Sequence, residues 1–149
     1  MRQRKESASF EALKAEAFIR GESTLSVVCD RPFDEVALQL EGSIVANDLG
    51  ILQVHDFRRL LQAKGMSLEH NCRVYEVCNP RLTAQLIDID PGLAHVLPCR
   101  ISMHDQGGVT TVTTPMPSAL MTEFSHAANV ARLARTFEAG LQRVLRGLL

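Results

Sequence analysis

Hydrophobic positions along the chain switch repeatedly between strand spacing and helical spacing. Five segments alternate apolar and polar residues as strands do: 23–29, 51–55, 72–78, 98–104 and 109–114. Four others repeat apolar residues at the spacing of an amphipathic helix: 31–46, 56–64, 79–90 and 125–149. This order predicts an α+β fold with a single, antiparallel-containing sheet of about five strands, helices packed on one face of it and a long C-terminal helix.

Turn and capping residues mark where these elements begin and end. Gly107 and Gly108 form a tight turn between the last two strands, which makes that pair an antiparallel hairpin. Asn79-Pro80 is a typical helix start, since an Asn side chain caps free N–H groups and proline fits a first turn. Asp56 can likewise cap the short helix that follows it, and we expect Leu60 and Leu61 of that helix to face inward.

The residues before the first strand are predicted to form a helical arm that ends at Gly21. Its stripe of apolar residues consists of Phe10, Leu13, Ala17 and Phe18. We therefore expect two parts, an N-terminal helical arm at residues 1–21 and a single α+β domain at residues 22–149. One interpretation makes the arm an assembly element, with Phe10 and Phe18 clasping another subunit.

Composition narrows the possible classes of function. The 149 residues are 46% hydrophobic, and 16 Lys and Arg against 17 Asp and Glu give a formal net charge of −1. Because so balanced a chain lacks the basic surface on which general nucleic-acid binding depends, no nucleic-acid partner is expected. No apolar run approaches the roughly 20 residues of a membrane-spanning helix, and the basic start of the chain leads into polar residues rather than an apolar signal segment. We therefore expect a cytoplasmic protein without a membrane partner.

A set of local motifs resembles a known family. The motifs are Tyr75 ahead of Cys78-Asn79-Pro80, a helix with Ala84 and Leu86, Asp90-Pro91, Leu97-Pro98-Cys99 leading into a hairpin, a threonine-rich strand, Pro115 and a long closing helix. Over about residues 23–148 the chain is similar to the prokaryotic family known as domain of unknown function 302. The resemblance implies an antiparallel sheet backed by helices and a homodimer, and it implies no particular reaction. The chain departs from the family pattern at Arg100, where other members often carry Asn.

Four cysteines without a secretion signal point to reduced thiols rather than a disulfide framework. Cys78 ends a strand directly before the helix start at Asn79, where unpaired N–H groups and the helix dipole favour an anion and can lower a thiol pKa. The alternation places Cys78 on the strand face of Val74, expected to be the core, which favours a structural role. Cys99 opens the next strand, so an antiparallel pairing of the two strands would bring the two thiols together at one end of the sheet. Such a pair could serve redox or persulfide chemistry, or bind a soft metal together with a nearby His.

Signatures of metal and anion sites are weaker. The chain has neither a Cys-x-x-Cys nor a His-x-x-x-His pair, so we expect no metal site and no cofactor. Arg73, Arg100 and His104 fall on one alternating face of two candidate neighbouring strands. That face is either an anion patch or the wet side of an antiparallel sheet.

Two functions of different class follow from these residues. The leading hypothesis is a homodimeric module, not an enzyme, that binds a small ligand or a partner protein, because no catalytic constellation is complete. Its candidate binding residues are Cys78, Asn79, Cys99 and Arg100. The alternative is a thiol-dependent enzyme or sulfur carrier that uses Cys78 with Cys99 in support. The sequence therefore leaves open whether the protein is an enzyme.

Overall fold

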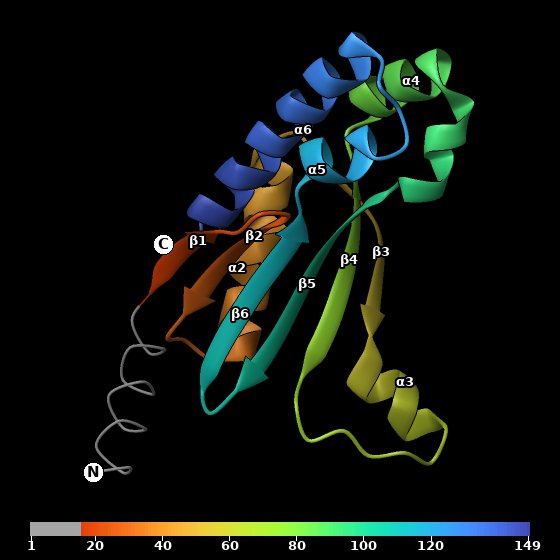
Figure 1. The fold of residues 1–149 in the computed structure, drawn as a ribbon. Coiled ribbons are helices and arrows are strands. Elements are labelled where there is room, and N and C mark those ends of the chain that lie inside the picture. The colour runs from red at the N-terminus through yellow and green to blue at the C-terminus, as the bar shows by residue number, and fades with distance from the viewer. Residues whose placement is uncertain (1–15) are drawn as a thin grey trace, which may run out of the picture.

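Six strands form one antiparallel sheet in a computed structural model, which describes residues 16–149. The strands are β1 (Ala17–Arg20), β2 (Thr24–Cys29), β3 (Gly50–Asp56), β4 (Cys72–Cys78), β5 (Cys99–Gln106) and β6 (Val109–Pro115). Their order across the sheet is β1-β2-β6-β5-β4-β3, and every neighbouring pair is antiparallel (Figure 1). The α+β fold with a single sheet is confirmed, and the expected number of five strands is one too few.

The helices cover one face of this sheet and extend beyond both of its ends (Figure 1). They are α2 (Phe33–Ala46), α3 (Phe57–Ala63), α4 (Pro80–Ile89), the 3-10 helix η1 (Pro91–Val96), α5 (Pro117–Thr122) and α6 (Ala128–Arg146). The core lies between the sheet and the two long helices α2 and α6 (Figure 1). The predicted apolar stripe of the last helix is buried there, which confirms the long C-terminal helix. Its members are Val130, Leu133, Ala134, Phe137, Leu141, Val144, Leu145 and Leu148.

The additional strand is β1, which occupies residues that we expected to be helical. Phe18 lies opposite Val27 of β2, and the guanidinium of Arg146 stands 4.1 Å from the centroid of its ring. Arg20 forms an ion pair of 3.3 Å with Glu138 of α6. Pairing with β2 gives hydrogen-bond partners to backbone N–H and C=O groups at that edge of the sheet. This stabilisation outweighs the weak helical pattern of the segment. The helical prediction is therefore wrong for Ala17 and Phe18, whereas Phe10 and Leu13 lie outside the described residues.

The face of β4 that packs into the core is the opposite of the predicted one. Tyr75 and Val77 are fully buried in the core, whereas Val74 and Cys78 are only partly buried on the opposite side. Tyr75 tolerates burial because its hydroxyl donates a hydrogen bond of 2.9 Å to Oε1 of Glu41 on α2. A tyrosine can therefore take a core position that its polar group alone would disfavour.

The same reversal divides the expected anion patch. Arg73 lies on the helix-covered side, with its guanidinium 5.2 Å from the centroid of the Phe33 ring. Arg100 and His104 alternate with the buried Ile101 and Met103, so they lie on the other face of the sheet. The three residues therefore do not form a single patch.

Helix α3 is capped as predicted, but it buries less apolar surface than predicted. The side chain of Asp56 accepts a hydrogen bond of 3.1 Å from the backbone N–H of Arg59, which confirms the predicted cap. Leu60 is 43% exposed because α3 lies beside the ends of β3 and β4 and not over the core, so the inward orientation predicted for it is wrong. None of the helices in residues 16–149 combines the length and apolar character needed to cross a bilayer.

Candidate functional site

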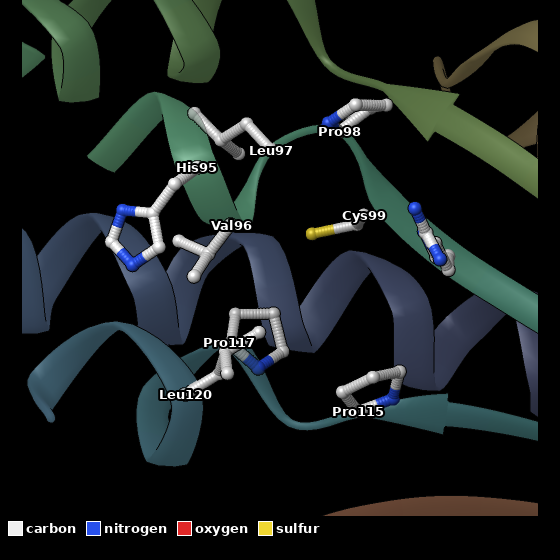
Figure 2. A pocket seen from close by; sticks show the side chains of 9 residues that line it. His95, Val96, Leu97, Pro98, Cys99, Pro115, Pro117 and Leu120 are labelled. Atoms are coloured by element: carbon white, nitrogen blue, oxygen red, sulfur yellow. The ribbon is translucent and has the colours of Figure 1, made fainter. Parts of the chain in front are cut away.

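A pocket lies at the end of the sheet where β5 begins and β6 ends, with η1 and α5 on either side of it (Figure 2). Its volume is about 220 Å³. The residues that line it are His95, Val96, Leu97, Pro98, Cys99, Arg100, Pro115, Pro117 and Leu120. Most of these side chains are apolar, and none is acidic.

Local interactions fix the two short helices that form its walls. The side chain of Asp90 accepts a hydrogen bond of 2.9 Å from the N–H of Gly92, which caps the start of η1. On the other wall, Pro117 opens α5 and Ser118 binds the buried carboxylate of Glu138, with Oγ at 2.6 Å and the backbone N–H at 3.2 Å from Oε1. Since Glu138 belongs to α6, these bonds tie α5 to the long helix. The pocket therefore lies between elements that are anchored independently of any ligand.

Cys99 forms the floor of the pocket. Its sulfur points into the space between η1 and α5 (Figure 2), although the residue as a whole is only 7% exposed. Burial, and to a smaller extent the neighbouring Cys78, raise the pKa of the Cys99 thiol to about 12. At neutral pH, Cys99 is therefore a neutral thiol, which suits a soft, weakly polar wall rather than a nucleophile.

Two side chains at the mouth carry the polar chemistry. The Arg100 side chain is 67% exposed, and its Nη2 stands 4.0 Å from Oε1 of Glu76. The backbone carbonyl of Arg100 accepts a hydrogen bond of 2.9 Å from Oγ1 of Thr114, which fixes the start of β5 against β6. His95 holds its Nδ1 at 2.5 Å from the carbonyl oxygen of Gly92, and a carbonyl only accepts, so Nδ1 is the protonated nitrogen. Its Nε2 is then the nitrogen left for a ligand or solvent.

The candidate residues Cys78 and Asn79 lie beside the pocket but do not line it. Asn79 caps α4, since its Oδ1 accepts a hydrogen bond of 3.1 Å from the N–H of Leu82. Cys78 is partly buried, with Sγ at 3.3 Å from Oγ1 of Thr83 on the same helix. Val77, the residue before it, lies opposite Cys99 across the β4–β5 ladder. The structure thus brings Cys99 and Arg100 into the pocket and leaves Cys78 and Asn79 at the adjoining start of α4.

Comparison with known proteins identifies the family. Residues 25–148 match the family model described as Domain of unknown function DUF302. The chain belongs to this family. The match covers every element from β2 to α6, and β1 precedes it.

A solved structure supports the same fold for this DUF302 chain. The crystal structure of an uncharacterized conserved DUF302 protein from Bacillus stearothermophilus superimposes with a TM-score of 0.79 at 22% sequence identity, covering 87% of this chain and 100% of that chain. At this identity the similarity shows the fold alone. A comparison with curated proteins gave no significant match.

The remaining cysteines and histidines of the DUF302 domain do not form a second centre. Cys29 is buried and burial raises its thiol pKa, while burial and the carboxylate of Asp56 raise that of Cys72. Within residues 16–149, no three His, Cys, Asp or Glu side chains come together in a group able to hold a metal ion.

Sequence reasoning missed much of the pocket lining. Four lining residues come from two short elements: His95 and Val96 from η1, and Pro117 and Leu120 from α5. Helix η1 packs on α4 and α5, and α5 packs on α6, so local periodicity does not predict where either element lies. A local signal was present on either side, since Leu97-Pro98-Cys99 and Pro115 are among the motifs that resemble the family. Prolines near strand ends indicate fixed turns, and the pocket is lined by three of them.

Proposed function

We propose that this DUF302 protein is a binding module for a small, largely apolar molecule that occupies the pocket at the end of β5 and β6. The observation that carries the proposal is a space of about 220 Å³ whose walls include Val96, Leu97, Pro117 and Leu120 and whose floor is the thiol of Cys99. That space corresponds to roughly seven water volumes, enough for a small organic molecule. Burying apolar ligand surface against such walls supplies the driving force for binding.

The chemistry of the pocket favours binding over catalysis. Catalysis through Cys99 would require a thiolate, and burial keeps the pKa of this thiol near 12. The pocket also contains no carboxylate that could act as a general base beside the thiol. These features support a module that holds a molecule without transforming it.

We also propose that the module is a homodimer. Figure 1 shows α2 and α6 on one face of the sheet and no helix of residues 16–149 across the other face. That open face carries the apolar Ile19 and Val74 among polar side chains such as Ser26 and Thr113, whose hydroxyls are 3.0 Å apart. A second copy is a common means of covering such a face. Arg100 lies on this face, so the mouth of the pocket borders the proposed interface.

The binding proposal is tested by nuclear magnetic resonance titration of the ¹⁵N-labelled full chain with 1-hexanol and with hexanoate. The amide signals expected to shift most are those of η1, α5 and the first residues of β5. Leu120→Trp fills the pocket and should abolish these shifts, whereas Leu38→Trp, at a 72% exposed position on α2, should leave them unchanged. Val96→Phe provides a second filled pocket if the tryptophan variant loses its dispersed spectrum. Shifts scattered over the surface, or shifts that survive in both filled variants, would contradict the proposal.

A further inference from the structure

We propose that the ligand of this pocket is a small amphipathic anion, with an apolar body between η1 and α5 and a carboxylate or similar oxyanion held at the mouth by Arg100. This inference rests on the proposed function, because it names the chemical class of the molecule that the pocket binds. It follows from how charge is distributed among the lining residues and their neighbours.

Arg100 is the only residue of the pocket lining with a permanent charge, and its existing ion pair is weak. Its Nη2 is 4.0 Å from Glu76, the outer limit for an ion pair, and the arginine side chain is 67% exposed. The carboxylate of Glu76 is shared with His55, whose Nε2 stands 3.6 Å from the other oxygen. Exposed pairs of this kind contribute little, so most guanidinium donors of Arg100 remain free for a ligand.

A planar guanidinium favours a particular kind of partner. Its parallel N–H groups match the two oxygens of a carboxylate, which gives a charge-assisted pair with defined geometry. The β5 backbone that carries Arg100 is held by the hydrogen bond from Thr114, so the side chain extends from a fixed point at the pocket mouth. An uncharged ligand would forgo this interaction entirely.

A cationic ligand finds no comparable partner in the pocket. None of the nine lining residues is acidic, and the Gly92 carbonyl near the mouth already accepts from His95. Two carboxylates lie close by: Glu76, which faces Arg100 and His55, and Glu123, which lines a separate adjoining hollow with Pro115 and Leu120. Because the Cys99 thiol is neutral, the floor does not repel an anion either. The pocket is therefore electrostatically selective for negative ligands.

Three probes of matched length separate the charge states: hexanoate, 1-hexanol and hexylammonium, titrated at pH 7 into the ¹⁵N-labelled full chain. We expect hexanoate to bind about threefold more tightly than 1-hexanol, the contribution of one ion pair at an exposed guanidinium, and hexylammonium to bind more weakly than either. Arg100→Met should remove the advantage of hexanoate and leave the affinity for 1-hexanol unchanged. Glu76→Gln, which removes a negative charge close to the proposed carboxylate site, should strengthen hexanoate binding. Arg135→Met on the exposed side of α6 is the matched control and should keep the preference intact.

The outcomes distinguish this inference from the function on which it rests. If 1-hexanol or hexylammonium binds in the pocket as tightly as hexanoate, or if Arg100→Met leaves the preference intact, the anionic ligand is overturned while the binding module stands. If none of the three probes shifts the amide signals of η1 and α5, both proposals are contradicted.

Discussion

Cys99 and Cys78 show how a side chain's surroundings decide its chemistry. Both were candidate site residues in the sequence, and both lie at the same end of the sheet. Cys99 is buried at the pocket floor with a pKa raised to about 12, whereas Cys78 is partly buried at the start of α4, with its sulfur 3.3 Å from the Thr83 hydroxyl. Sequence spacing placed the two residues together but could not show which sulfur faces a cavity.

The raised pKa of Cys99 predicts loss of stability in alkali. The folded protein keeps this proton up to about pH 12, whereas the unfolded chain releases it near pH 9, so the stabilisation is fully present below pH 9 and is lost as the pH rises toward 12. Cys99 should contribute a decline of up to about 1.4 kcal/mol per pH unit in this window. Denaturant unfolding of wild type and Cys99→Ala between pH 8 and pH 11, with a reductant present, measures it.

Comparing wild type with Cys99→Ala isolates the contribution of Cys99 to the alkaline loss of stability. Tyr75, whose pKa burial raises to about 12, adds to the alkaline decline of both proteins and cancels in the difference. We expect the stability of Cys99→Ala to fall less steeply above pH 9. Equal slopes would mean that the thiol is not buried as described.

Labelling tests the ranking of the four thiols. Cys78 should react first with limiting N-ethylmaleimide, because it is partly exposed directly before α4 rather than buried in the core. Cys29 and Cys99 are buried, and burial together with Asp56 raises the pKa of Cys72. Peptide mass spectrometry should find Cys78 modified first, and Cys78→Ser should remove the fastest phase. Labelling of Cys78 only after denaturation would exclude it from any sulfur chemistry.

At the scale of elements, long periodic segments were predictable and short ones were not. The apolar stripe of α6 and the hairpin at Gly107-Gly108 were read directly from the sequence, because each is determined by local pattern. The burial of Tyr75 could not be read from the sequence, because it depends on a hydrogen bond to Glu41, which is far away along the chain on α2. Helix α5 is held by Glu138 on α6, so no local pattern marks the wall that it contributes to the pocket.

Strand β1 allows a direct test of how much the N-terminal segment contributes. Deleting residues 1–20 should leave a cooperatively folding domain, because the core between the sheet and helices α2 and α6 remains. Melting should occur about 5 °C lower, since the packing of Phe18 and the pair between Arg20 and Glu138 are lost. Circular dichroism melting of the truncated chain measures both. Phe18→Ala in the full chain should reproduce part of the decrease, and a truncated chain without a cooperative transition would show that the segment is indispensable.

At the scale of the whole molecule, the uncovered sheet face predicts a homodimer. Light scattering coupled to size exclusion should give twice the monomer mass of 16.5 kDa at micromolar concentrations. Val74→Lys, which places a charge on the open face, should shift the population toward monomer, whereas Leu38→Lys on the exposed side of α2 should not. A mass of 16.5 kDa for the wild-type chain across that range would contradict the homodimer.

The most direct test of the account is a crystal structure of the full chain grown with hexanoate. We predict density for its apolar chain between Val96 and Leu120, in contact with the sulfur of Cys99, and its carboxylate within hydrogen-bond distance of the Arg100 guanidinium. Crystals of Leu120→Trp grown in the same way should lack that density. An empty pocket in wild-type crystals at a saturating hexanoate concentration, or hexanoate bound only elsewhere on the molecule, would contradict the claim that this pocket is the binding site.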